Sequence, residues 1–398
     1  MATRRPPNRK AQIRATAAEL FLQHGYHNVS VTDVADELGI TASALYHHYR
    51  NKQDLLLNAV LDSLDTVDAL IRDADDLDAA LRALAALVTG PRSVLAVWER
   101  EARNLETAQR AAIREREVAA VSRFVPLLRA ERPELSEHTA HLVARAVLGA
   151  LGSRRRHRIS LPRRRHEQLM LDLGRLVAFA PLPTRPAPEA PTSVPAGPPP
   201  GVAGGGLRRG RREQLLTEAI RLFDERSYQS VTMTDIGEAA GIVASGVYRY
   251  FPSKTDLLVA AVNRGSEQLR AATETALAQT GDSREVLTRL LRAHIAISLE
   301  QTHLIGILAN ERDQLPDKER NTLRRLQSDY LNVWVQALGN VLPERETPEL
   351  KVIVHAAHGM IYFTIRVSGT DPWPDLPQRL SDLGLAMLTG ARNTSGTC

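Results

Sequence analysis

The sequence predicts an all-α protein made of two tandem copies of one helical unit. The main observation is an internal repeat: residues 12–60 and 214–262 align without a gap at a constant shift of 202, and 19 of the 49 positions are identical. Ala, Leu and Arg dominate the composition and favour helices, whereas only 4% of the residues are aromatic. No stretch shows the alternation that is typical of strands. A repeat this long indicates two units of one fold.

Each copy begins with short helices followed by a longer one. The first helix carries apolar residues at positions i, i+4, i+7 and i+8, namely Ile13, Ala17, Leu20 and Phe21. A second helix is expected over Val31–Leu38, where Ser30 or Thr32 could act as the N-cap. Gly39 supplies the turn into a third helix over Ala42–Tyr49, and a longer helix follows. This order of elements is that of a helix-turn-helix.

A segment rich in proline and glycine, residues 181–206, divides the chain into two halves. Beyond the repeated heads the halves match at a shift of 210, for example at Glu101 and Glu311 or at Gly149 and Gly359. The change in shift implies eight extra residues in the second half. We therefore expect a head, a helical domain, a linker, a second head and a second helical domain, over residues 1–62, 63–180, 181–206, 207–264 and 265–392.

Composition and charge narrow the class of protein. A hydrophobic content of 43% is ordinary for a globular protein with a core, and a net charge of +5 suits an acidic polymer as partner. The only cysteine, Cys398, is the last residue, which excludes an internal disulfide and a zinc site built on cysteines. The charged N-terminus resembles no signal peptide, and no apolar run is long enough to span a bilayer. We expect a cytoplasmic protein without a membrane segment.

The helix-turn-helix predicts that each head reads double-stranded DNA, with its second helix in the major groove. Small or hydroxyl-bearing residues at the start of that helix permit close approach to bases and phosphates. The candidate contacts are Thr41, Ala42, Ser43, Ala44 and His47 in the first head, and Ala244, Ser245, Gly246 and Arg249 in the second. Basic residues before each head, including Arg4, Arg5, Arg208 and Arg209, could contact phosphates or the minor groove, or could be solvated termini.

The residues 31–56, VTDVADELGITASALYHHYRNKQDLL, and 234–258, TDIGEAAGIVASGVYRYFPSKTDLL, resemble the signature of the TetR/AcrR family of transcriptional regulators. The resemblance covers about 50 residues in each half. It implies that Tyr46, Tyr248, His47, Arg249, Lys52 and Lys254 hold phosphates or base edges, and that Thr32 and Thr234 anchor the first reading helix to the DNA backbone. The two-copy layout resembles the tandem members of the family, such as the mycobacterial repressor of a mammalian-cell-entry operon.

The two heads differ at positions that would face DNA. Val243 is the equivalent of Thr41, which could cap the reading helix of the first head. Gly246 replaces Ala44, and Arg249 replaces His47. The heads should therefore prefer different half-sites, so we expect an imperfect palindrome as operator. The alternative is that the second head folds without reading DNA.

The resemblance also implies that the later helices of each half form a ligand pocket and a pairing bundle, and that ligand binding lowers operator affinity. Candidate pocket residues are polar or aromatic side chains within apolar helices: Trp98, Arg103, Phe124, His294, Trp334, His355, His358 and Tyr362. The alternative for each is a packed or hydrogen-bonded core residue. We expect no metal site and no cofactor, because the pairs His355/His358 and His138/His141, each three residues apart, lack a nearby carboxylate or cysteine partner. The arginine-rich run from residue 154 to residue 165 is expected to be a solvated loop, although it could touch DNA or an acidic partner.

Two chains supply the pairing bundle in ordinary members of the family, by two-fold symmetry. Here the linker could pair the two halves of one chain as an intramolecular pseudo-dimer, whereas pairing of like halves would give a homodimer. The expected function is that of a sequence-specific regulator, a repressor that a small apolar, lipid-like ligand releases from its operator. The alternatives are a DNA-bridging scaffold without ligand sensing and an enzyme with DNA-binding heads. The sequence contains no motif of a phosphate loop, a nucleophile elbow or a zinc protease, so we expect no enzyme.

Overall fold

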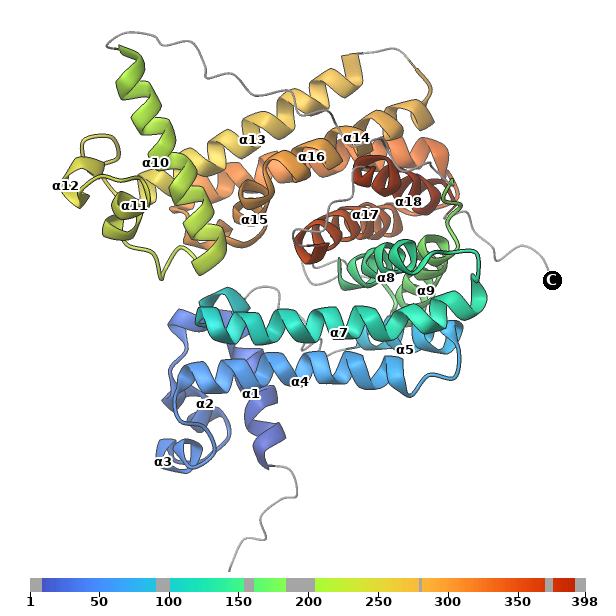
Figure 1. Ribbon diagram of the computed structural model, residues 1–398, viewed down its shortest axis with the longest axis horizontal. Helices are drawn as coiled ribbons and strands as arrows, with labels where there is room; N and C mark the ends of the chain where they lie inside the picture. Colours follow the sequence, from blue (N-terminus) through green and yellow to red (C-terminus); the bar gives the residue numbers. More distant parts are fainter. Residues whose placement is uncertain are drawn as a thin grey trace, which may run out of the picture. The chain divides into compact units, whose positions relative to one another are not determined.

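A computed structural model describes residues 9–90, 101–153, 161–183, 205–278, 281–368 and 375–390. Within these ranges every regular element is a helix, as the sequence predicted (Figure 1). None of these helices is long and apolar enough to cross a membrane. The chain divides into two compact units: residues 1–179 with 355–367, and residues 180–354 with 368–398.

The first head consists of α1 (Arg9–His24), the 3₁₀ turn η1 (Tyr26–Asn28), α2 (Val31–Glu37) and α3 (Ala42–Tyr46), and it packs on the start of α4 (Lys52–Arg72). Its core contains the apolar residues that the helical spacing of α1 placed on one face, with Ile13, Ala17 and Phe21 fully or almost fully buried. The third helix is shorter than expected, because it ends at Tyr46 rather than Tyr49 and gives way to a turn.

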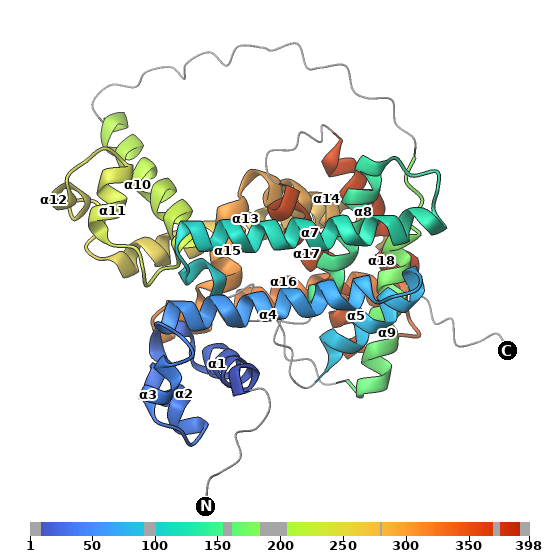
Figure 2. The same ribbon diagram turned by 60° about the horizontal axis from the view of Figure 1, so that its bottom comes forward.

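The helical domain of the first half contains α5 (Leu77–Thr89), η2 (Ala102–Asn104), α7 (Thr107–Glu131), α8 (Glu137–Gly152) and α9 (Arg163–Ala178). The helix α4 packs along α7, while α9 packs on both α5 and α8. Figure 2 shows α1, α2 and α3 at one end of α4, and α5 and α9 near its other end. The long helix α4 therefore connects the head directly to the helical domain.

The second half repeats this order of elements. Its head contains α10 (Gly205–Arg226), α11 (Met233–Ala239) and α12 (Ala244–Val247), followed by α13 (Lys254–Ala278). Its helical domain contains α14 (Ser283–Glu300), α15 (Thr302–Asn310), η4 (Arg312–Gln314), α16 (Asp317–Val341), α17 (Thr347–Ser368) and α18 (Leu376–Gly390). The helix α10 begins at Gly205, two residues before the boundary that the composition suggested.

The backbone explains two glycines of the repeat and one exception. Gly39 and Gly241 have φ values of 62° and 67°, so the turn between the two helices of each head uses the left-handed region. Gly25, after α1, has a φ of 83°, and Ser227 replaces it in the second copy. Ser227 keeps a φ of 64°, which L residues other than glycine adopt at a cost. The second head therefore preserves the turn without the glycine that favours it.

The eight extra residues of the second half lie in a helical hairpin. Both α4 and α13 begin at the repeated lysine, but α13 has 25 residues and α4 has 21. At the shift of 210, α5 would begin at residue 287 of the second half, whereas α14 begins four residues earlier, at Ser283. Below the tip the register is preserved, because Gly174 lies against Leu81 and Gly384 lies against Leu291. Each arm of the hairpin is thus one helical turn longer.

Candidate nucleic-acid interface

The first helix of each reading unit is capped in the same way. The Ser30 hydroxyl accepts a hydrogen bond from Asp33 N at 3.1 Å, and the Asp33 carboxylate accepts one from Ser30 N at 2.7 Å. Thr232 and Asp235 form the same capping box in the second head. The hydrogen bond from the Ser30 backbone lowers the pKa of Asp33. Of the two caps considered, Ser30 is therefore the N-cap, which leaves the exposed Thr32 free of that role.

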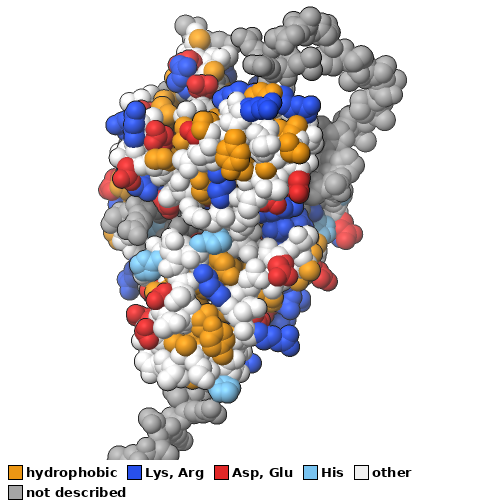
Figure 3. Space-filling view, turned by 90° about the vertical axis from the view of Figure 1, so that its left-hand side faces the viewer, with side chains coloured by type: hydrophobic (Ala, Val, Ile, Leu, Met, Phe, Trp, Pro, Cys, Tyr) orange, Lys and Arg blue, Asp and Glu red, His pale blue; other side chains and the backbone are white. Residues whose placement is uncertain are grey.

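The reading helices α3 and α12 present the same surface in both heads. Residue by residue, 41–49 and 243–251 show an identical order of exposed, half-buried and buried positions. Leu45 and Val247 point into the core, while the tyrosines at the next position, Tyr46 and Tyr248, are 53% and 54% exposed. A large aromatic side chain left half in water at both equivalent positions is typical of a contact surface. Figure 3 shows one face of the molecule, on which basic and acidic side chains are interspersed with hydrophobic ones.

The remaining candidate contacts lie on this surface as well. His47 and Arg249 are exposed next to the tyrosines, Ser43 and Ser245 are exposed one turn earlier, and the smaller residues of the reading helices are half-buried. Thr234 is exposed on α11, as Thr32 is on α2. Arg4 and Arg5 lie outside the described residues, and Arg208 and Arg209 lie in the first turns of α10, where side chains are not described. DNA contact by these residues stays a prediction.

The missing cap at Val243 has the consequence that the sequence suggested. The Thr41 hydroxyl accepts a hydrogen bond from Ala44 N at 3.2 Å, whereas no side chain caps α12. The Val243→Thr variant should stabilise the second head by about 1 kcal/mol, because it restores that acceptor. Chemical unfolding measures the change, and Thr41→Val should produce the opposite change in the first head. Equal stability of wild type and Val243→Thr would contradict this explanation.

Lys52 and Lys254 hold the head together in addition to any contact with DNA. The Lys254 Nζ donates to Tyr228 O at 2.9 Å and to Val231 O at 2.8 Å, and it lies 4.4 Å from the centroid of the Tyr228 ring. Lys52 lies 4.2 Å from the centroid of the Tyr26 ring. Burial lowers the pKa of both lysines. Lys254 therefore holds the segment that leads into α11, and Lys52 packs on the tyrosine that precedes α2, roles that the sequence alone did not indicate.

A buried glutamate connects each helical domain to its head. Glu101 and Glu311 are 4% and 1% exposed. The Glu101 carboxylate accepts hydrogen bonds from Tyr26 N at 3.2 Å and from Asn104 Nδ2 at 2.8 Å, and Glu311 accepts one from Tyr228 N at 2.9 Å. The repeat aligned these glutamates, but a single sequence gave them no role. We call this contact, from Glu101 to Tyr26 and from Glu311 to Tyr228, the domain clamp.

Removal of the clamp should loosen the head. The Glu311→Ala variant leaves the Tyr228 N–H without this acceptor and should cost about 1–3 kcal/mol of unfolding free energy. Glu311→Gln keeps a carbonyl acceptor, so it should lose less. Hydrogen exchange at the Tyr228 amide and chemical unfolding measure both variants. The clamp would have no energetic role if Ala and Gln proved indistinguishable from wild type.

The described pocket candidates divide between the two compact units. His294 on α14 and Trp334 on α16 lie together, with ring centroids 6.1 Å apart, and His294 Nδ1 is hydrogen-bonded to the Tyr330 hydroxyl at 2.9 Å. Tyr330 was not among the candidates. Phe124, the equivalent of Trp334 in the first half, is fully buried on α7, and Arg103 is half-buried in η2. His355, His358 and Tyr362 belong to the first compact unit, and Trp98 lies outside the described residues.

Burial lowers the pKa of His294 to about 4, from an ordinary value of 6.5. The fold therefore holds the neutral imidazole, and the unfolded chain binds a proton first as the pH falls. The free energy of unfolding should be unaffected by this group above pH 6.5 and should fall by roughly 3 kcal/mol between pH 6.5 and pH 4. Urea unfolding across this range measures the slope, and His294→Gln should remove that share of it. An equal slope in the variant would assign the pH dependence to other groups.

Within the described ranges, no group of three or more histidine, cysteine, aspartate or glutamate side chains could hold a metal ion. The arginine-rich run, expected to be a loop, ends in a helix, because residues 163–165 form the first turn of α9. Residues 154–160 lie outside the described residues. The expectation of a solvated loop is therefore wrong for the end of the run.

Two helix-turn-helix heads, each joined by a long helix to a helical domain, define a tandem helix-turn-helix protein. The family of bacterial regulatory proteins named tetR matches the chain twice, at residues 13–59 and 215–261. The chain is therefore a tandem member of the TetR family.

Curated relatives are regulators of the same type. The transcriptional repressor KstR2 of Rhodococcus jostii is 29% identical over 139 residues, which are 33% of this chain and 65% of the relative. The transcriptional repressor KstR of Mycolicibacterium smegmatis is 36% identical over 73 residues, 18% of this chain and 36% of the relative. The activator FasR of the same species is 34% identical over 96 residues, which are 22% of this chain and 44% of the relative. The chain spans less than two thirds of the length of these relatives.

Solved structures of regulators also resemble part of this chain. The ketosteroid transcriptional regulator KstR2 of Mycobacterium tuberculosis is 22% identical with a TM-score of 0.37 and covers 45% of this chain and 93% of its own. The regulator AibR, solved in complex with isovaleryl coenzyme A and operator DNA, is 19% identical with a TM-score of 0.37. The match covers 44% of this chain and 97% of AibR.

Proposed function

We propose that the chain is a transcriptional repressor that binds double-stranded DNA through both heads and reads an imperfect palindrome. The observation that carries the proposal is the matched exposure of α3 and α12, which present different side chains at equivalent exposed positions. Thr41 and His47 are exposed in the first head, and their equivalents Val243 and Arg249 are exposed in the second. Ala44 and its equivalent Gly246 are half-buried. Two readers of one geometry and different chemistry suit two related but unequal half-sites. Such a regulator would act in the cytoplasm and would perform no catalysis.

The two halves are proposed to pair within one chain, as a pseudo-dimer. Support comes from the first compact unit, which contains the segment 355–367 of α17. A Cβ on Gly149 would lie 2.8 Å from Phe363 Cβ, and a Cβ on Gly359 would lie 2.6 Å from Ser153 Cβ. Residues 149 and 153 are equivalent to 359 and 363 at the shift of 210, so the contact is reciprocal, as in a two-fold interface. Light scattering should give a mass near 43.8 kDa at all concentrations, whereas a doubled mass would indicate a homodimer.

The effector is proposed to be a small apolar ligand that releases the operator. KstR2 is described as a ketosteroid transcriptional regulator, and AibR was solved in complex with isovaleryl coenzyme A, which favours a steroid- or acyl-like compound. The pairing of His294 with Tyr330 beside Trp334 offers polar groups within an apolar core, the composition that small-molecule sites use. The domain clamp supplies a direct contact through which a change in the helical domain would reach the head.

DNA footprinting with the purified full chain tests the proposal. We expect protection of two unequal half-sites near the chain's own gene, and loss of protection on addition of an apolar ligand such as a steroid or an acyl-CoA. Absence of specific protection would overturn the DNA-binding proposal. Protection that no apolar ligand of either class changes would instead favour the bridging scaffold.

A further inference from the structure

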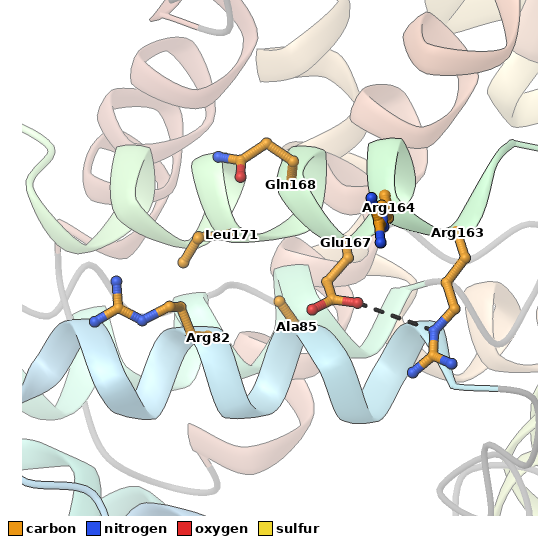
Figure 4. A pocket seen from close by; sticks show the side chains of 7 residues that line it. All are labelled: Arg82, Ala85, Arg163, Arg164, Glu167, Gln168 and Leu171. Atoms are coloured by element: carbon orange, nitrogen blue, oxygen red, sulfur yellow. Dashed lines mark ion pairs between the residues drawn. The ribbon is translucent and has the colours of Figure 1, made fainter.

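A groove of about 500 Å³ lies between α5 and α9 of the first half, away from the reading helices. Figure 4 shows Arg82 and Ala85 on α5, and the other lining residues on α9, with the guanidinium groups of Arg82 and Arg163 to either side of the apolar floor. The lining consists of Arg82, Ala85, Arg163, Arg164, Glu167, Gln168 and Leu171. A groove of this size accommodates a small organic molecule.

Positive charge exceeds negative charge in this lining. It contains three arginines and one carboxylate, a formal charge of +3 − 1 = +2. Glu167 lies 4.0 Å from Arg163, the long limit of an ion pair, and Arg82 pairs with Asp78 outside the groove. Within the described part of the chain, Arg164 takes part in no ion pair. The groove therefore contains cationic donors in excess of its own acceptors.

The start of α9 adds to this charge. The helix begins after Pro162 with no side chain as cap and no acidic residue in its first turn. Three arginines, 163–165, stand there instead, at the end of a helix that favours anions. Cations at this position oppose the helix dipole, and an anion between them would offset both the dipole and the mutual repulsion. The apolar contacts of α9 hold it in place, because Leu169, Met170 and Leu173 are buried.

The second half shows that the fold does not need these arginines. At the shift of 210, Arg163 and Arg164 correspond to Trp373 and Pro374, and Glu167 corresponds to Pro377. Only Arg82 has a cationic equivalent, Arg292. A duplicated unit therefore carries the cluster in one copy alone, which separates it from the residues that build the helical domain.

We propose that the groove between α5 and α9 binds a small organic phosphate. The guanidinium fork matches phosphate oxygens with two donors at once. Arg163 and Arg164 stand together at the start of α9, and Arg82 lines the groove from α5. Ala85 and Leu171 form an apolar floor that fits the organic part of the ligand. This site is independent of operator binding, and its ligand chemistry differs from that of the apolar effector.

Calorimetric titration of the full chain with inorganic pyrophosphate, at constant ionic strength and without DNA, tests the site. We expect one equivalent to bind, and the double variant Arg163→Gln/Arg164→Gln to bind at least tenfold more weakly. The matched control is Arg284→Gln/Arg292→Gln, which removes two exposed arginines of α14 and changes the net charge by the same amount. The control should bind like wild type.

The proposal is overturned if pyrophosphate does not bind, or if both double variants lose binding equally, since that result indicates a general charge effect. It is also overturned if only phosphatidylglycerol vesicles, and not pyrophosphate, bind in a manner that depends on Arg163 and Arg164, because a lipid surface is then the partner. These outcomes are separate from those of the footprinting, because no DNA is present.

Discussion

Replacement of Arg249 by alanine should weaken operator binding by about 1–3 kcal/mol, roughly 5- to 150-fold. Arg249 is exposed on α12 beside Tyr248, and a guanidinium at the reading helix supplies donors that alanine lacks. A gel shift with the full chain and its footprinted operator measures the change. Arg284→Ala, which removes an exposed arginine from the helical domain, is the control and should bind like wild type. Unchanged affinity in Arg249→Ala would mean that the second head does not read DNA.

A further variant tests whether the residues of the reading helix determine the DNA sequence that is preferred, rather than only adding positive charge. The triple variant Thr41→Val, Ala44→Gly and His47→Arg gives both heads the same solvent-facing residues on the reading helix over positions 41–47. Its preference should shift from the imperfect palindrome toward a symmetric one made of two copies of the second half-site. Unaltered preference would place specificity outside these helices.

Replacement of Gly149 by alanine should destabilise the protein by about 1–3 kcal/mol, the usual range for overpacking. The added Cβ would lie 2.8 Å from Phe363 Cβ, 3.0 Å from Gly359 O and 3.1 Å from Met360 Cα, and two of these are backbone atoms that cannot rotate away. The sign of the change in unfolding free energy is informative. Replacement of glycine by alanine at an open position within a helix normally stabilises a protein by about 0.5–1 kcal/mol.

Gly210 on α10 supplies that open position, since a Cβ there would meet nothing within 4 Å. Chemical unfolding of Gly149→Ala and Gly210→Ala should thus give changes of opposite sign. Faster hydrogen exchange in residues 355–367 of Gly149→Ala should accompany the loss. A stabilised Gly149→Ala would show that α8 and this segment do not pack closely.

The sequence was most informative where a local pattern determines the structure. The spacing of Ile13, Ala17 and Phe21 identified the buried face of α1, and the glycine at 39 marked the turn before α3. The absence of a hydroxyl at 243 correctly predicted an uncapped α12. These features depend on residues within one turn of each other.

Features that depend on residues far apart in the chain were not predictable in the same way. Glu101 meets Tyr26 across 75 positions, and nothing in the local sequence around either residue indicates the contact. The role of Tyr330 was not predictable either, because this residue lies in a polar stretch of α16. Its hydroxyl is hydrogen-bonded to His294. The resemblance made Lys52 and Lys254 candidate phosphate contacts. Only the fold reveals the carbonyl oxygens around Lys254 and the tyrosine ring beside each lysine.

The hairpin that differs between the halves shows where this fold accepts a change in length during evolution. Eight residues added at the tip extend each arm by four, about one turn or 6 Å, so Gly384 still lies against Leu291 as Gly174 lies against Leu81. The same eight residues added to one arm would rotate its apolar face or force a bulge. Descendants of the duplicated gene could therefore vary the length of this hairpin in one helical domain while its head and the other helices remained unchanged.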